Sequence, residues 1–212
     1  AWYTAKEQGR NRVHVHSEDD HQIKQRRGEM EWASRIPEAL DANRFELYCQ
    51  TIEPIVGNGL RGVHAEFLLR LRDKDGNLVM PGRFLPAAER YSLSMRVDRW
   101  VVSNAFSTIR RAQQQGCAIE LCSINLSGHS LGNEDFLEFI LDEMKQSGVS
   151  PHNVCFEITE TAAIYNLESA RRFISRLKQE GIKFSLDDFG TGLSSFAYLR
   201  ELPVDFLKID GV

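Results

Sequence analysis

A regular alternation of strand-like and helix-like segments constrains the fold of this chain more than any other feature. The strand-like segments are short and rich in β-branched and aromatic residues, whereas longer segments between them repeat apolar residues at helical spacing. Such an alternation predicts parallel strands joined by right-handed crossovers, and therefore an α/β fold. The predicted strands are residues 44–50, 62–69, 119–125, 154–159, 183–187 and 205–209.

Three segments between the strands have a clear apolar stripe and are predicted to be helices, at residues 96–114, 135–146 and 168–180. Each of them is followed by a glycine, the residue that most readily adopts the left-handed conformation of a helix cap. The pattern fits either an open doubly wound sheet or a barrel that is not yet closed. Periodicity alone does not decide between these two architectures.

The beginning of the chain differs from the rest. Residues 1–16 have the pattern of a helix end followed by a short strand, and residues 17–27 form a charged stretch without aromatic residues. We interpret that stretch as a solvated linker or as the start of a connecting helix. Domain-like patterning begins at Glu29. Because residue 1 is Ala and not Met, we expect the natural N-terminus to lie upstream.

Charge and cysteine content exclude several functional classes. The net charge of −4 gives no general attraction for DNA or for an anionic membrane, so an anionic ligand requires a local site. The four scattered cysteines fit neither a disulfide framework nor a zinc motif, which favours reduced thiols in the cytoplasm. No apolar run is long enough to span a bilayer, and no signal peptide is visible. We expect no direct membrane contact from this segment, although upstream segments of a longer protein can anchor it.

Polar side chains occur in, or at the end of, successive predicted strands. Several neighbouring carboxylates raise one another's pKa, and a divalent metal ion turns this repulsion into coordination. Oxygen donors without His or Cys favour Mg²⁺ or Mn²⁺ over zinc. In a barrel, this end of the strands carries the active site. The side chains concerned are Glu66, Asn125, Glu157, Asp187, Asp188 and Lys208.

The adjacent Asp187 and Asp188 suggest a site for two metal ions and in-line attack on a phosphodiester. Each residue also has a simpler interpretation when it is taken alone. Glu66 fits a surface strand, Asn125 fits the cap of a turn, and Lys208 fits a strand end with its amine in water. Their shared position at one end of successive strands favours a common function. The glycine-rich residues 190–195 are interpreted as a mobile lid or a loop of the metal site.

Taken together, these segments closely resemble the EAL family. The match runs from about Glu31 to Asp210, in the family's order and spacing. Its most specific part is the DDFGTG sequence at residues 187–192, followed by LPVDFLKID at 202–210. Residues 3–13 resemble the end of a GGDEF domain. The resemblance thus divides the chain into a GGDEF tail (1–16), a linker (17–30) and an EAL domain (31–212). The other matching segments are residues 45–50, 64–70, 84–89, 98–101, 123–127 and 156–161.

The resemblance implies a modified (β/α)₈ TIM-type barrel whose first strand is antiparallel. It also implies hydrolysis of cyclic-di-GMP to linear pGpG with two Mg²⁺ or Mn²⁺ ions. By position, the ligands of the first metal ion are Glu66, Asn125, Glu157 and Asp187. Asp187 bridges the two ions, and Asp188 binds the second one.

The remaining roles follow from the same resemblance. Lys208 corresponds to the lysine that contacts the attacking water, and Glu160 to the glutamate that anchors the glycine-rich loop. The substrate contacts are expected at Gln50, Leu68 and Arg70, with Arg70 on a phosphate group. Dimerisation is compatible with a mobile loop at residues 190–195, but the sequence does not decide the oligomeric state.

This sequence departs from the family pattern at several points. Phe67 replaces the usual Ala of the signature triplet, and strand alternation predicts that it faces the helix layer. Thr51 stands where Pro is usual, and Gly211 where a larger residue is common. A barrel of this kind needs about 250 residues. We therefore expect the chain to be truncated after about six strands, with a later metal-ligand glutamate beyond Val212.

Two other functional classes compete with a metal-dependent phosphodiesterase. A degenerate EAL domain would bind cyclic-di-GMP as a receptor without hydrolysing it. Such receptors usually lose members of the Glu, Asn and Asp-Asp set, and this chain keeps every member that it is long enough to contain. A purely structural interaction domain has no reason to retain these polar residues at its strand ends. The sequence therefore favours the enzyme.

Overall fold

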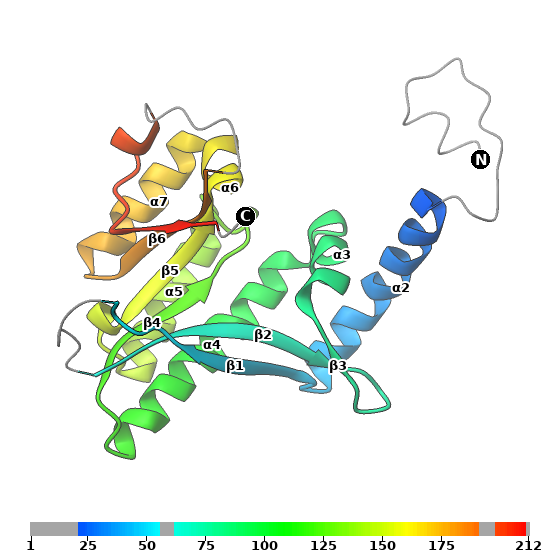
Figure 1. The fold of residues 1–212 in the computed structure, drawn as a ribbon, viewed down its shortest axis with the longest axis horizontal. Helices are drawn as coiled ribbons and strands as arrows, with labels where there is room; N and C mark the ends of the chain where they lie inside the picture. Colours follow the sequence, from blue (N-terminus) through cyan, green and yellow to red (C-terminus); the bar gives the residue numbers. More distant parts are fainter. Residues whose placement is uncertain (1–20, 56–61, 191–197, 211–212) are drawn as a thin grey trace.

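A computed structural model describes residues 21–55, 62–190 and 198–210 of the chain. Its strands form one curved sheet in the order β1-β2-β4-β5-β6-β7, with the short β3 paired to β2 (Figure 1). β1 runs antiparallel to β2, and the pairs from β2–β4 to β6–β7 are parallel. The strands are β1 (Phe45–Thr51), β2 (Val63–Arg72), β3 (Leu78–Val79), β4 (Ile119–Asn125), β5 (Val154–Thr159), β6 (Lys183–Phe189) and β7 (Phe206–Ile209).

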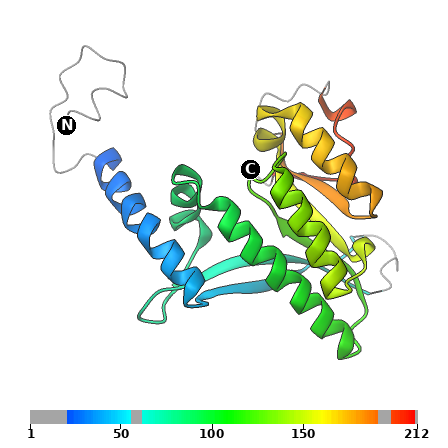
Figure 2. The same cartoon turned by 180° about the vertical axis from the view of Figure 1, so that it is seen from behind.

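Along the chain, helices connect the successive parallel strands from β2 to β6, and these helices pack on one face of the sheet. Figure 2 shows α4 and α5 across that face, and α7 packs against β6. α2 packs on α3, while its first turns project away from the sheet (Figure 1). The helices are α2 (His21–Asp41), α3 (Leu85–Arg90), α4 (Ser94–Gln114), α5 (Glu134–Ser147), α6 (Glu160–Tyr165) and α7 (Leu167–Gln179). None of the helices in the described ranges is both long and apolar enough to cross a lipid bilayer.

The core lies between the sheet and this helix layer. Alternate residues of each strand point to opposite faces, so Phe156 and Ile158 of β5 pack among the helices while Glu157 points to the other face. Phe67 is buried in the same core, which confirms that the bulky residue of the signature triplet faces the helices. The apolar content of the strands therefore stabilises one face and leaves the opposite face for polar side chains.

The structure confirms the expected fold class. The strands follow the parallel order of a (β/α)₈ barrel, and the first strand is antiparallel as the family resemblance implied. The six predicted strands agree with the structure within three residues at their ends. The prediction missed β3, which has two residues, and the six-residue helices α3 and α6. Such short elements carry too little periodicity to be recognised.

The first part of the chain is tested only in part. α2 begins at His21, which agrees with the interpretation of residues 17–27 as the start of a connecting helix. Residues 1–20 lie outside the described ranges, so the proposed GGDEF tail is not tested and the domain boundaries remain predictions.

Candidate active site

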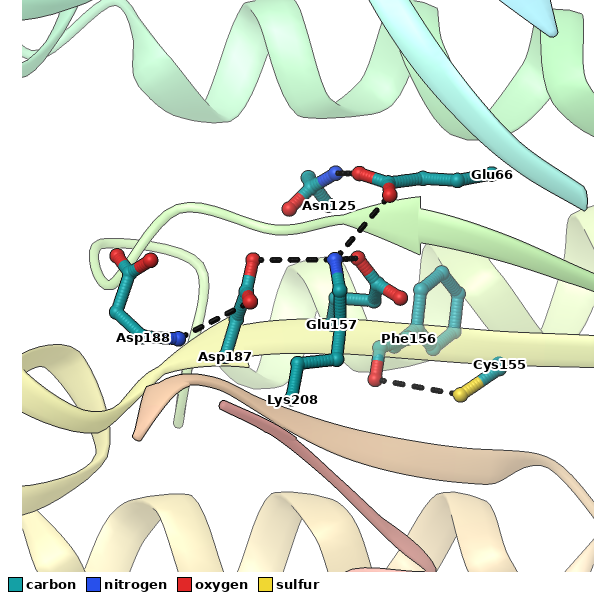
Figure 3. Close-up of polar contacts among 8 residues, drawn as sticks. All are labelled: Glu66, Asn125, Cys155, Phe156, Glu157, Asp187, Asp188 and Lys208. Atoms are coloured by element: carbon teal, nitrogen blue, oxygen red, sulfur yellow. Dashed lines mark hydrogen bonds and ion pairs between the residues drawn. The ribbon is translucent and has the colours of Figure 1, made fainter. Parts of the chain in front are cut away.

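The predicted polar residues meet at the carboxyl ends of the strands, on the sheet face opposite the helices (Figure 3). Strand pairing brings them together, because Asn125 of β4 lies beside Glu157 of β5, and Glu66 of β2 lies beside Ser123 of β4. Asp187 and Asp188 come from β6, and Lys208 from β7. Five neighbouring strands thus contribute to one polar cluster, as the sequence predicted.

The ammonium group of Lys208 lies at the centre of this cluster. Its Nζ is 2.6 Å from Oε2 of Glu157, 3.2 Å from Oε2 of Glu66 and 3.3 Å from Oδ2 of Asp187. An ammonium group has three N–H donors, so it can donate to all three carboxylates at once. Lys208 therefore neutralises part of the negative charge that β2, β5 and β6 bring together.

Asn125 completes the inner part of the cluster. Its Nδ2 donates a hydrogen bond to Oε1 of Glu66 at 2.8 Å, while the other oxygen of Glu66 faces Lys208. Both oxygens of Glu66 are thereby held by side chains of two other strands. This arrangement fixes the orientation of the carboxylate at the end of β2.

Burial and charge shift the pKa values in this cluster. Burial raises the pKa of the Glu157 carboxyl, and the charge of Glu66 adds to this effect, while Lys208 opposes it. Burial acts to lower the pKa of Lys208, but the hydrogen bond to Glu157 and the charges of the three carboxylates outweigh it and raise that pKa. Lys208 is therefore a persistent cation at neutral pH. The site thus combines this cation with one buried carboxyl, Glu157, whose pKa is raised.

Asp188 differs from its neighbour in backbone and environment. Its φ of 54° lies in the left-handed region, which is unfavourable for a residue with a Cβ. Its N–H donates to Oδ1 of Asp187 at 3.0 Å, and Figure 3 shows its carboxylate on the far side of Asp187 from Lys208. Burial raises the pKa of Asp188, and the charges of Asp187 and Asp210 add to this. The turn thus directs two adjacent carboxylates to different places.

Glu160 lies next to this turn, in the first turn of α6. The hydroxyl of Thr159 caps that helix by accepting a hydrogen bond from the N–H of Ala162 at 3.3 Å. The buried carboxylate of Glu160 accepts a hydrogen bond from the N–H of Gly190 at 3.1 Å. Glu160 therefore holds the first residue of the glycine-rich loop, and residues 191–195 of that loop lie outside the described ranges.

The expected substrate contacts lie on the same face of the sheet, farther toward β1. In the β1–β2 pairing, Gln50 lies opposite Glu66, and Leu68 and Arg70 follow at alternate positions along β2. The guanidinium of Arg70 lies 5.5 Å from the ring centroid of Tyr48. All three residues therefore line the face that carries the carboxylates.

The structure also contains a buried group next to the site whose role the sequence did not indicate. Oδ2 of Asp98, in α4, accepts hydrogen bonds from the N–H of Ser127 at 3.0 Å, and from the hydroxyls of Ser127 and Ser130 at 2.6 Å each. These serines belong to the turn that follows Asn125. From the sequence, this network could have been suspected only because Asp98 lies among the apolar residues of a helix face. Its hydrogen-bond partners are distant in sequence and could not be identified in that way.

The donor set suits a hard metal ion in its chemistry. The side chains that converge are carboxylates and one amide, and Mg²⁺ and Mn²⁺ prefer the oxygen atoms of such groups. Within the described ranges, however, no three His, Cys, Asp or Glu side chains are placed as they would be around an ion. Lys208 instead contacts three of the carboxylates. Glu66, Asn125, Glu157 and Asp187 thus fit a metal ion by donor type. In the structure the three carboxylates contact the ammonium group of Lys208, and Asn125 donates to Glu66.

Comparison with known proteins gives similar sequences and similar folds. The sequence model of the EAL domain family matches residues 33–212. The cyclic di-GMP phosphodiesterase PdeB of Shewanella oneidensis is 39% identical over 100% of this chain and 24% of its own length. The cyclic di-GMP phosphodiesterase PdeF of Escherichia coli is 32% identical over 84% of this chain and 23% of its own length. The chain thus spans about a quarter of the length of these curated relatives.

Two solved structures are similar to the chain in fold. The PaMucR phosphodiesterase in complex with c-di-GMP has a TM-score of 0.76 at 29% identity, over 85% of this chain and 72% of that one. The FimX EAL domain from Pseudomonas aeruginosa bound to c-di-GMP has a TM-score of 0.78 at 29% identity, with the same coverage of both chains.

Proposed function

The chain belongs to the EAL-domain family, and on that premise we propose that the protein that carries it is a metal-dependent phosphodiesterase that hydrolyses cyclic-di-GMP to linear pGpG. Relatives named cyclic di-GMP phosphodiesterases support the reaction, and two similar structures contain c-di-GMP. The observation that carries the proposal is the convergence of Glu66, Glu157 and Asp187 on Lys208 at the carboxyl ends of their strands.

The family's phosphodiesterases generally depend on metal ions, and two Mg²⁺ or Mn²⁺ ions are proposed here. Glu66, Asn125, Glu157 and Asp187 would hold the first ion, with Asp187 shared and Asp188 on the second. When bound, such ions would polarise the phosphate and activate water. The carboxylate of Asp188 lies on the far side of Asp187 from Lys208, which supports a role for it separate from that of the inner cluster.

The chain's own residues then have distinct tasks in the proposed reaction. In the proposed reaction Lys208 stays protonated at neutral pH, gives up one of its three carboxylate contacts and donates that N–H to the attacking water. Arg70 binds a phosphate group by charge-assisted hydrogen bonds, and Gln50 and Leu68 contact the rest of the ligand. Addition of water to phosphorus and cleavage of one P–O bond open the ring. Glu160 keeps the start of the glycine-rich loop beside Asp188.

A receptor that binds cyclic-di-GMP without hydrolysing it is the second candidate. The chain keeps every polar residue of the family set that it is long enough to contain, which favours the enzyme, because binding alone does not require ligands for metal ions. The discriminating experiment incubates the full-length protein with cyclic-di-GMP and follows pGpG by chromatography, in EDTA and then with excess Mg²⁺. An enzyme loses turnover in EDTA and regains it with Mg²⁺. Binding without product in either buffer identifies a receptor.

Several further properties belong to the same proposal. Residues 1–16 would be the tail of a GGDEF domain and residues 17–30 a linker that includes the start of α2, ahead of the EAL domain at 31–212. The protein would act in cytoplasmic second-messenger signalling, with cyclic-di-GMP as its ligand. Limited proteolysis tests the boundaries, because cleavage between residues 17 and 30 should release an intact EAL domain.

A further inference from the structure

On the antiparallel strands β1 and β2, Glu46 forms its ion pair with Arg72 and not with Arg70, the residue directly opposite it. The strand register places Glu46 of β1 directly opposite Arg70 of β2. Glu46 nevertheless pairs with Arg72, whose Nε lies 2.7 Å from its Oε1. Side chains directly opposite each other in an antiparallel pair are near neighbours, so Arg70 is an equally accessible partner for this carboxylate.

Arg72 is held in place by more than Glu46. Its Nη1 donates to the carbonyl oxygen of Gly76 at 3.0 Å, in the turn that follows β2. Its Nη2 lies 3.5 Å from the hydroxyl of Tyr48, on the strand opposite. These contacts orient the guanidinium so that its Nε points at Glu46. Glu46 is thereby paired with an arginine that is fixed on two other sides.

Arg70, in contrast, makes no ion pair with any residue that the structure describes. Its Nη1 donates to the carbonyl oxygen of Leu69 at 2.8 Å, and its guanidinium lies over the ring of Tyr48. A cation–π contact orients a guanidinium without neutralising its charge. The charge of Arg70 thus remains available on the face of the sheet that carries the carboxylate cluster.

We propose that Arg72 is a positioning residue for substrate binding, which keeps Glu46 occupied so that the guanidinium of Arg70 stays available to a phosphate of the ligand. The inference rests on the proposed function, since it concerns the same binding site. Tyr48 assists by holding the guanidinium of Arg70 over its ring. A cation two residues beyond the proposed phosphate-binding arginine then adds to ligand affinity without touching the ligand.

The expected effect is modest, because Glu46 and Arg72 are both more than a third exposed. Exposed ion pairs are weak, so a released Glu46 can change the equilibrium for phosphate binding to Arg70 by about fivefold at most. Replacement of Arg72 should therefore raise KM by about three- to fivefold and change kcat much less.

The experiment measures KM and kcat for cyclic-di-GMP in four forms of the full-length protein. Arg72→Met keeps most of the aliphatic stem, removes the charge and should raise KM. Arg72→Lys keeps a cation beside Glu46 and should have nearly the wild-type KM. The double variant Glu46→Gln with Arg72→Met loses the same contact to Gly76, but it has no carboxylate to capture Arg70, so its KM should return to the wild-type value. Thermal unfolding of each variant reports whether the fold is intact.

An unchanged KM in Arg72→Met overturns the inference. A raised KM that the Glu46→Gln substitution does not restore also overturns it, because Arg72 then acts through something other than Glu46. If the wild-type protein binds cyclic-di-GMP but does not hydrolyse it, the same variants are compared by dissociation constant, and the inference is judged apart from the proposed hydrolysis. A wild-type protein that does not bind cyclic-di-GMP contradicts both.

Discussion

Nζ of Lys208 lies 2.6 Å from Oε2 of Glu157, and this ion pair joins the last described strand to the middle of the sheet. The Glu157 side chain is only 2% exposed, so its charge depends on Lys208 for compensation. The same ammonium group contacts Glu66 and Asp187. One cation therefore compensates three carboxylates. Its removal should lower both the free energy of unfolding and the rate of the proposed hydrolysis.

Lys208→Met should destabilise the metal-free protein by about 1–3 kcal/mol, because three carboxylates are left without a charged hydrogen-bond partner. The free energy of unfolding, measured with urea in EDTA and again in Mg²⁺, checks this. Mg²⁺ should narrow the difference between variant and wild type, since a divalent cation takes over the role of the ammonium group. Equal stability of the two proteins in EDTA would show that Lys208 does not stabilise the cluster.

The pH dependence of this pair has a definite direction. The carboxylates raise the pKa of Lys208 above its ordinary value of 10.5. Its contribution to stability is therefore fully present below pH 10.5 and is lost as the pH rises through the raised pKa. The stability difference between wild type and Lys208→Met should be constant from pH 7 to 9 and should decrease only above pH 10.5. A decrease already complete at pH 9 would contradict the raised pKa.

Asp98 gives a second pH prediction with the opposite direction. Burial raises the pKa of its carboxyl, although hydrogen bonds from Ser127 and Ser130 oppose the shift. The contribution of Asp98 to stability therefore falls as the pH rises from about 3.8 through the raised pKa. Asp98→Asn does not titrate and keeps an oxygen for the three donors. Its stability relative to wild type should improve as the pH rises from 4 to 7.

Urea unfolding at a series of pH values measures this difference for Asp98→Asn. The exposed Asp142, which lies beside Lys145 on α5, provides the matched control as Asp142→Asn. A stability difference for Asp98→Asn that does not change with pH would show that the carboxyl of Asp98 titrates alike in the folded and unfolded protein.

Phe67 and Leu68 are neighbours in β2 that face opposite sides of the sheet, and they should respond differently to truncation. Phe67→Ala should cost about 3–5 kcal/mol of stability, since the ring is buried among the helices, and should leave KM nearly unchanged. Leu68→Ala should cost less stability and raise KM, since Leu68 lines the proposed ligand face. Denaturant unfolding and steady-state kinetics on both variants check this. A large KM change in Phe67→Ala alone would reverse the assignment of faces.

The sequence predicted those parts of the fold that depend on periodicity within one segment. β4 and β5 have the predicted ends, because their alternation is strong and polar residues close them. The same alternation placed Phe67 on the face away from Glu66 and Leu68, among the helices. The family resemblance then selected a barrel, which periodicity had left open. The polar residues at the strand ends were predicted from their positions within the same strand patterns.

Periodicity within one segment could not predict the side-chain contacts between segments that are distant in sequence. Lys208 and Glu66 are 142 residues apart, and their contact requires the whole order of strands between β2 and β7. Asp98 meets Ser130 across 32 residues because α4 packs beside the end of β4. The choice of Arg72 over Arg70 by Glu46 depends on the turn at Gly76 and on Tyr48. Side-chain competition of this kind is decided by geometry that no local pattern encodes.

The most direct test of the account compares the rate of pGpG formation from cyclic-di-GMP by the full-length wild-type protein and by Asp187→Asn, in Mg²⁺. Asn keeps the shape of the side chain but removes the charge that faces Lys208 and that is assigned to both metal ions. We expect hydrolysis by the wild type, a loss of several orders of magnitude in the variant, and a cooperative melting transition in both proteins. Near-normal turnover in Asp187→Asn, or no turnover in the wild type, would contradict it.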